Sequence, residues 1–132
     1  MTAQLQIHAQ DLRGCVIVRP VGEVDLSNAS TLEGRLCALI ERDHMVVDLS
    51  RATFVDSTAL SAMIVAYRRG QVLGHTLRLS GAQGQVRRVL EITQLDVVLE
   101  HHDDVGDAVE AALCEYDATI PSARSSAVSA TE

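Results

Sequence analysis

The amino-acid sequence predicts an α/β sandwich in which four helices cover a mixed central β-sheet of about five strands. Three observations support this fold class. The chain opens with extended segments joined by turn residues, a compact apolar run of the kind found in buried strands lies near its middle, and segments of helical periodicity then alternate with short strands. At 132 residues the chain is long enough for one domain and too short for two.

The N-terminal third reads as strands followed by a helix. Residues 4–9 alternate polar and apolar side chains, which is the period of a half-buried strand. Turn-forming residues at 11–14 lead into extended segments at 15–18 and 21–24, so antiparallel pairing is predicted. Apolar residues recur at helical spacing within 27–42. A capping-box pattern leaves the start of this helix open between Ser27 and Ser30.

The middle of the chain contains the buried strand. Residues 45–49 form the apolar run, and residues 50–53 read as a polar loop. Helical spacing then begins at Ser57 and continues to Tyr67. Residues 76–79 read as the next strand.

The C-terminal part contains the last predicted elements. Residues 86–90 mark a third helix, and residues 97–99 read as a last short strand. A final helix over 103–114 is capped by Asp103 or Asp104. The Ser-, Ala- and Thr-rich composition from Asp117 onward predicts a domain of residues 1–116 and a disordered tail of residues 117–132.

Composition excludes several classes of function. The net charge is −7, Arg supplies every basic side chain apart from His, and aromatic residues make up only 2% of the chain. A nucleic-acid binder needs a basic face or stacking aromatic residues, so neither double- nor single-stranded nucleic acid is an expected partner. No apolar run is long enough to span a membrane, and no signal peptide is visible. We therefore expect a cytoplasmic protein without membrane association.

The residues that most often carry chemistry do not form a catalytic pattern. Cys15, Cys37 and Cys114 are far apart in the sequence and contain no CxxC pair, so neither a zinc site nor a thioredoxin-like motif is indicated. Cys15 and Cys37 are expected to pack as small apolar side chains, and Cys114 is expected to be the exposed thiol. The run at 101–104 (His-His-Asp-Asp) reads as a solvated loop. No catalytic residue, cofactor or metal is predicted.

The strongest candidate site is Asp56-Ser57-Thr58, which follows the central strand and opens a helix. In open α/β sheets, function gathers at the carboxyl ends of strands, and a helix N-terminus favours an anion. A phosphate on Ser57 would gain the first-turn N–H groups and would add about −1.5 to −2 charges beside Asp56. The competing interpretation is an ordinary N-cap, in which Asp56 or Ser57 accepts from those N–H groups. The motif alone favours capping.

Three segments together resemble a known family. Residues 22–25 (Gly-Glu-Val-Asp), residues 46–50 with residues 54–60 (Phe-Val-Asp-Ser-Thr-Ala-Leu), and the region 81–95 resemble the STAS family in order and spacing. The resemblance covers roughly residues 5–113. It implies a STAS-type sandwich for residues 1–116. One departure is Ala59, because the family often has glycine at that position.

The resemblance implies an anti-sigma factor antagonist controlled by a phosphorylation switch. In such proteins the unmodified form binds an anti-sigma factor that is itself a serine kinase, and a sigma factor is released. The kinase then phosphorylates the serine that matches Ser57, with Thr58 as a second choice, and a PP2C-type phosphatase resets the switch. Asp25, Ser27 and Asp56, together with Ser57 and Thr58, match the partner-binding surface.

Two other functions remain open from sequence alone. The chain would be a non-phosphorylated STAS scaffold subunit of a signalling or lipid-transport complex if Ser57 were only a cap. It would be a nucleotide-binding STAS module if the loop at 50–58 held ATP or GTP. A weak homodimer also remains open.

Overall fold

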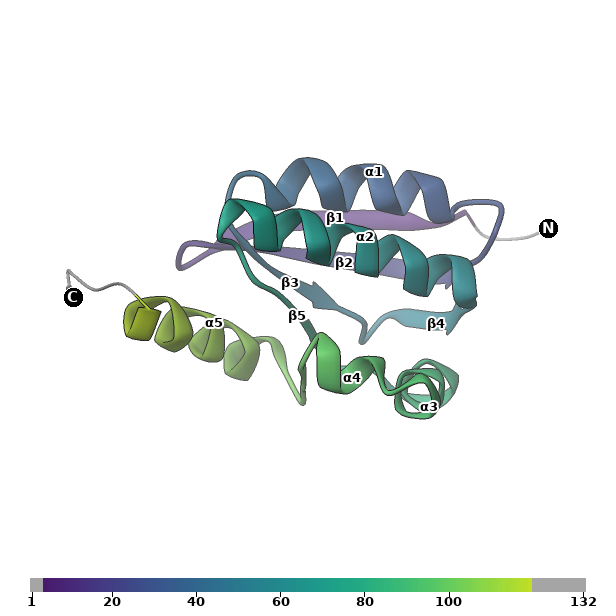
Figure 1. Cartoon of the computed structure of the whole chain (residues 1–132). Coiled ribbons are helices and arrows are strands. Elements are labelled where there is room, and N and C mark those ends of the chain that lie inside the picture. Colours follow the sequence, from purple (N-terminus) through teal and green to yellow (C-terminus); the bar gives the residue numbers. More distant parts are fainter. Residues whose placement is uncertain (1–3, 120–132) are drawn as a thin grey trace.

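The structure is a computed structural model that describes residues 4–119 of the chain. Within these residues, strands and helices follow one another as shown in Figure 1. Their bounds are β1 Gln6–Leu12, β2 Cys15–Val24, α1 Ala29–Ile40, β3 His44–Asp48, β4 Ala52–Val55, α2 Ser57–Leu73, β5 Leu77–Ser80, α3 Gly84–Thr93, α4 Leu95–Val98, β6 His101–His102 and α5 Val105–Thr119.

The strands form one mixed sheet in the order β1-β2-β3-β5-β6, with β4 paired to β2 outside this path. β1 and β2 are antiparallel, and all other pairs are parallel. The long strand β2 pairs with β3 over residues 15–18 and with β4 over residues 22–24. Pro20, which has no backbone N–H to donate, lies between these two stretches, where β2 changes partner. The predicted mixed sheet is confirmed.

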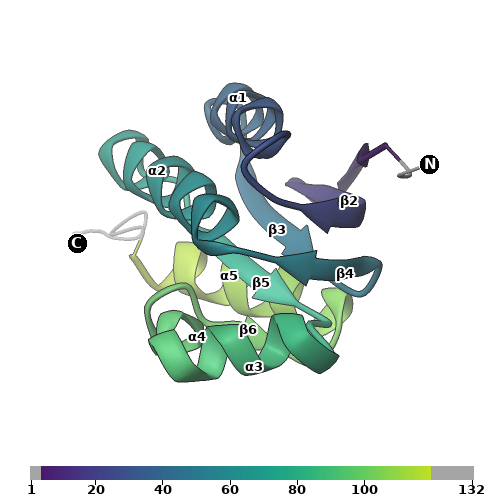
Figure 2. The same cartoon turned by 90° about the vertical axis from the view of Figure 1, so that its right-hand side faces the viewer.

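Helices cover both faces of the sheet (Figures 1 and 2). The large core lies between the sheet and the helices α1 and α2, and it is built from aliphatic side chains such as Leu36, Met45 and Leu79. A smaller cluster joins α5 to the opposite face and includes Ile17 and Val109. Because aromatic residues are so scarce, Val, Leu, Ile, Ala and Met fill both cores.

Helix α3 closes the open edge of the short strand β4. The side-chain Oε1 of Gln85 accepts the Val55 N–H at 3.0 Å, and its Nε2 donates to the Val55 carbonyl at 2.9 Å. One side chain therefore makes the contacts that a neighbouring strand would make. This pairing holds β4, and the loop that follows it, in place.

The predicted strand at 97–99 is wrong. Residues 95–98 form helix α4, and the last strand is β6. Leu95 and Leu99 are buried one helical turn apart, whereas Val97 is 73% exposed. The pair of valines suggested a strand, but the period of burial is helical, so residues 4–119 contain five helices and not the predicted four.

Other element boundaries also differ from the predictions. Residues 52–55, half of which were predicted as loop, form β4 because β2 provides a partner for them. Helix α1 follows Asn28, and not Ser27 or Ser30. Asp104 is the residue that caps α5, through a bond of 2.8 Å from the Asp107 N–H.

Helix α5 continues to Thr119, three residues beyond the predicted end of the domain at residue 116. The rest of the predicted tail, residues 120–132, lies outside the described residues. The boundary between domain and tail therefore stays a prediction. Among residues 4–119, no helix has the length and apolar character needed to cross a membrane.

Candidate functional site

The candidate site is formed by two loops at neighbouring strand ends. In the parallel pair of β2 and β4, Val24 lies beside Val55, so Asp25 and Asp56 leave the sheet at the same edge. The Asp56 N–H donates to the Val24 carbonyl at 3.3 Å, which ties the second loop to the first. Two turns that are about thirty residues apart in sequence are therefore adjacent in space.

Asp56 is the N-cap of α2. Its Oδ1 accepts the backbone N–H groups of Thr58 at 2.9 Å and Ala59 at 3.2 Å, and it also accepts the Thr58 hydroxyl. The Thr58 hydroxyl is the largest influence on the pKa of Asp56; together with the N–H groups of Ala59, Thr58 and Leu26 it outweighs the opposing effect of burial and lowers that pKa. Asp56 is thus held as a carboxylate. The alternative left open by the sequence is resolved, because Asp56 and not Ser57 caps the helix.

Ser57 is the first residue of α2, and its side chain is exposed. Within the part of the chain that the structure describes, its hydroxyl makes no hydrogen bond, whereas the neighbouring Thr58 hydroxyl is bound to Asp56. The free hydroxyl therefore belongs to Ser57. It lies beside the N–H groups and the positive end of the helix dipole.

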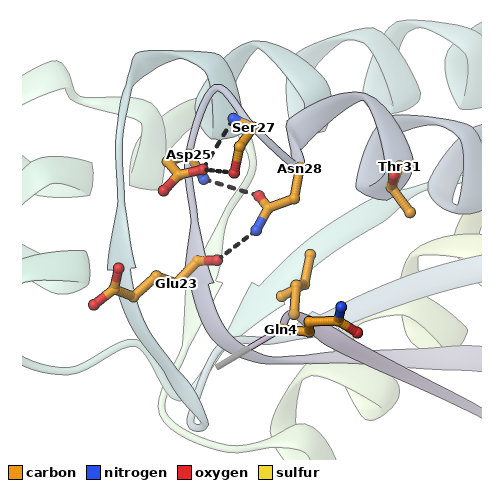
Figure 3. Close-up of a pocket in the computed structure, with 7 residues that line it drawn as sticks. Gln4, Glu23, Asp25, Ser27, Asn28 and Thr31 are labelled. Carbon is orange, nitrogen blue, oxygen red and sulfur yellow. Dashed lines mark hydrogen bonds between the residues drawn. The ribbon is translucent and has the colours of Figure 1, made fainter. Parts of the chain in front are cut away.

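The first loop has the same construction around Asp25. Its Oδ1 accepts the Ser27 N–H at 3.0 Å and the Ser27 hydroxyl at 2.6 Å, as Asp56 does with Thr58 (Figure 3). Asn28 locks this turn, since its side-chain oxygen accepts the Asp25 N–H at 2.9 Å and its nitrogen donates to the Glu23 carbonyl at 2.9 Å. Sequence reasoning missed Asn28, although Asp-x-Ser-Asn is typical of side-chain-stabilised turns.

A recess of about 360 Å³ lies beside the Asp25 loop (Figure 3). It is bounded by the two residues just before β1, the end of β2, the loop that follows it and the first turn of α1. Two of its lining residues are acidic, but the Asp25 carboxylate is bound to Ser27 and the Glu23 carboxylate points away from Gln4 and Thr31 (Figure 3). Its full lining is Gln4, Leu5, Glu23, Asp25, Ser27, Asn28 and Thr31.

Two apolar side chains are exposed near the ends of β2 and β4. Leu26, the middle residue of the Asp25 turn, is 79% exposed, and its N–H lies against the Asp56 carboxylate. Phe54 lies on β4, two residues before Asp56, and is 38% exposed. Neither residue was identified as a site residue from sequence. Their exposure is a tertiary property that periodicity does not reveal.

The remaining sequence candidates lie elsewhere. Cys15 is buried in β2, Cys37 is half-buried in α1 and Cys114 is exposed on α5, as predicted. Burial raises the pKa of the Cys15 and Cys37 thiols, which suppresses thiolate chemistry. The ring of His101 accepts the Ala82 N–H at 3.0 Å. Among residues 4–119, no three His, Cys, Asp or Glu side chains converge as metal ligands would.

The loop proposed for nucleotide binding is largely regular structure. Residues 52–55 belong to β4, and α2 begins at Ser57. The backbone of Val55 is paired with Gln85 on one side. A phosphate-binding loop presents several unpaired N–H groups, and most of this segment has already used them.

Comparison with known proteins agrees with this architecture. The STAS domain family model matches residues 6–108. The anti-sigma F factor antagonist of Paenibacillus polymyxa is 26% identical over 108 residues, which cover 80% of this chain and 92% of that protein.

Solved structures show the same fold. The crystal structure of an anti-sigma factor antagonist from Mycobacterium paratuberculosis has a TM-score of 0.76 at 24% identity, covering 86% of this chain and 99% of that one. The Bacillus cell fate determinant SpoIIAA, in its phosphorylated form, has a TM-score of 0.63 at 17% identity, covering 82% and 98% of the two chains.

Proposed function

The chain belongs to the STAS domain family, and from this premise we propose that it is an anti-sigma factor antagonist whose partner-binding surface is switched off by phosphorylation of Ser57. The surface consists of Asp25, Ser27, Asp56, Ser57 and Thr58. In this proposal the chain is a regulator and a kinase substrate. It is not itself an enzyme.

The observation that carries the proposal is that Asp56 caps α2, whereas the Ser57 hydroxyl is exposed and takes no part in the cap. Asp56 accepts the first-turn N–H groups, so the cap does not depend on the serine. Modification of the exposed Ser57 hydroxyl would therefore leave the helix intact. A phosphate there would face the helix N-terminus and add about −1.5 to −2 charges beside an existing carboxylate.

The surroundings of Ser57 explain how such a charge would release a partner. The exposed side chain of Leu26, whose N–H lies against the Asp56 carboxylate, suits a partner surface that is partly apolar. Covering a dianion next to Asp56 with such a surface removes its hydration without providing a counter-charge. A useful switch must weaken binding by at least two decades, which is about 2.7 kcal/mol. The desolvation of one uncompensated dianion is large enough to supply this difference.

The family assignment suggests the identity of the partners. The unphosphorylated chain would bind an anti-sigma factor with serine kinase activity, and a sigma factor would be released. The kinase would then modify Ser57, and a PP2C-type phosphatase would restore the binding form. The fold relative SpoIIAA, which has been solved in a phosphorylated form, supports phosphorylation as the chemistry of the switch.

The test is a phosphorylation assay with matched variants. Wild type, Ser57→Ala and Thr58→Ala are incubated with ATP and a lysate of the source organism, and intact masses are read. We expect one phosphate on wild type and on Thr58→Ala, and none on Ser57→Ala. In a pull-down, Ser57→Ala should retain its partner in the presence of ATP, whereas wild type should release it.

The outcome also separates this function from the scaffold alternative. A partner captured equally by wild type and Ser57→Ala, with no phosphate on either, would replace the switch with a permanent scaffold. Leu26→Ala tests the surface itself, because it should weaken capture in both models without lowering stability. Loss of partner binding in Ser57→Ala alone would make Ser57 a contact residue and would end the switch proposal.

A further inference from the structure

The peptide unit that joins Val55 to Asp56 is held from two sides. Its N–H, on Asp56, donates to the Val24 carbonyl of β2 at 3.3 Å. Its carbonyl, on Val55, accepts from Nε2 of Gln85 at 2.9 Å, and Oε1 of the same side chain accepts the Val55 N–H at 3.0 Å. Within residues 4–119, β4 pairs with β2 alone, so the other edge of Val55 is held by Gln85 and not by a strand.

This peptide unit determines where the Ser57 hydroxyl lies. Asp56 has an extended backbone, with φ −117° and ψ −173°, and in this conformation its Oδ1 accepts the first-turn N–H groups of α2. Because the peptide group is planar, a rotation of the unit before Asp56 changes the φ of that residue. Such a rotation would displace the Asp56 carboxylate and the neighbouring Ser57 hydroxyl together.

The residue that holds this unit is itself anchored. Gln85 lies in the first turn of α3, which runs beside β4 (Figure 1). The next residue, Val86, is fully buried in the main core. The segment that leads into α3 is bound to β6, because the Ala82 N–H donates to Nε2 of His101 at 3.0 Å. Gln85 therefore projects from a helix that the core and β6 both fix.

We propose that Gln85 is a positioning residue of the switch, which holds the Asp56–Ser57 loop in the conformation that the kinase recognises. This inference rests on the proposed function of Ser57. Without the two bonds to Val55, the loop would occupy the recognised conformation for only part of the time. The apparent affinity of the kinase for the chain would fall by that fraction, whereas the bound complex would be unchanged. Loss of Gln85 should therefore raise KM and leave kcat as it is.

The first experiment needs no kinase. Amide hydrogen exchange of the full chain, followed by NMR, compares wild type with Gln85→Leu, which removes both bonds at similar side-chain size. We expect the Val55 N–H to exchange at least about tenfold faster in this variant, while circular dichroism shows that it remains folded. Gln83→Leu is the matched control, because Gln83 is exposed and makes no side-chain cap bond. It should leave the exchange of Val55 unchanged.

The second experiment measures the phosphorylation kinetics. Initial rates are recorded with ATP and a fixed amount of lysate from the source organism, at increasing concentrations of the chain. We expect Gln85→Leu to raise KM about tenfold at an unchanged maximal rate, and Gln83→Leu to behave as wild type. A residue that served only stability would lower the midpoint of thermal unfolding. It would leave KM unchanged at temperatures where the variant is folded.

A second variant, Gln85→Glu, keeps the inference testable if Gln85→Leu fails to fold. Its carboxylate can accept the Val55 N–H but cannot donate to the Val55 carbonyl, whereas a protonated carboxyl group can do both. The amide resonances of Asp56 and Ser57 should therefore differ from those of wild type near pH 7. They should return toward the wild-type positions below about pH 4, where a glutamate side chain is protonated.

Three results would overturn the inference. The first is a folded Gln85→Leu variant in which the Val55 N–H exchanges as in wild type. The second is faster exchange of Val55 without a rise in KM. The third is a Gln85→Glu variant whose Asp56 and Ser57 resonances match wild type at both pH values. A wild-type chain that takes up no phosphate would instead refute the switch at Ser57, and the exchange experiment would still decide whether Gln85 holds the loop.

Discussion

Replacing Asp56 with alanine tests the arrangement on which the proposed switch depends. The substitution removes the acceptor of the Thr58 and Ala59 N–H groups and of the Thr58 hydroxyl. Loss of an N-cap side chain costs about 1 kcal/mol, within a range of about 0.5 to 2. For a domain of this size the midpoint of thermal unfolding should fall by about 3 to 5 °C. Asp56→Asn keeps an acceptor oxygen and should cost less.

The pH dependence gives an independent check on the same residue. Folding lowers the pKa of Asp56, chiefly through the Thr58 hydroxyl. The ionised form of Asp56 therefore stabilises the folded state relative to the unfolded chain. This contribution is fully present above the unfolded pKa of about 4, and it is lost as the pH falls through the lower folded value. The stability difference between wild type and Asp56→Ala should therefore be constant near neutrality and shrink below about pH 4.

Urea unfolding followed by circular dichroism measures these differences, and Ser57→Ala is the matched control. The Ser57 side chain is exposed and caps nothing, so its removal should change stability by less than about 0.5 kcal/mol. If Ser57→Ala cost as much as Asp56→Ala, the serine would share the cap. Phosphorylation would then damage the helix, and the separation of cap from switch would be refuted.

Three further predictions follow from packing, charge and exposure. Gly70→Ala should destabilise the protein by about 1 to 3 kcal/mol, because a Cβ at this position would meet the His75 carbonyl oxygen at 2.8 Å. Gly34→Ala should instead stabilise the protein by about 0.5 to 1 kcal/mol, because a Cβ on this residue of α1 would meet no other atom within 4 Å. Urea unfolding of the two variants compares these free energies. Burial alone would raise the pKa of Asp48, but hydrogen bonds from Ser50 and Arg19 outweigh burial and lower it. Asp48→Asn should therefore reduce the free energy of unfolding by about 1 to 2 kcal/mol at pH 7. The difference from wild type should disappear as the pH falls through the pKa of Asp48 in the folded state. A maleimide should label Cys114 rapidly in the native protein and Cys15 only after unfolding, which peptide mapping will show. Equal labelling rates would contradict the assigned burial.

The sequence correctly predicted the elements whose apolar side chains are buried in the core, because this burial leaves a regular hydrophobic pattern in the sequence. The apolar run at 45–49 and the helical spacing after Ser57 correspond to β3 and α2, because both elements bury apolar side chains in the main core. Strand β4 was only half predicted, since what makes it a strand is a partner segment on β2, 30 to 31 residues away, and the side chain of Gln85. Hydrogen bonds to distant segments leave no local signal.

The same limit applies to the site. Asp25 and Asp56 could be selected from their motifs, and the fold places them at one edge of the sheet. The choice between Asp56 and Ser57 as cap could not be made, because both side chains are suitable acceptors and only the geometry distinguishes them. Leu26 was missed because exposure of a loop leucine depends on what packs above the loop.

The two loops share one construction, and this explains why their middle residues are the ones available to a partner. In Asp25-Leu26-Ser27 and in Asp56-Ser57-Thr58, the first carboxylate binds the N–H and the hydroxyl of the third residue. The first and third side chains of each turn are therefore hydrogen-bonded to each other. The middle side chains, Leu26 and Ser57, are exposed. An apolar side chain and a modifiable hydroxyl are thus presented by two adjacent loops, each held by its own internal hydrogen bonds. A partner that covers Leu26 would also have to desolvate a phosphate on Ser57. A single covalent modification can therefore weaken the whole interface.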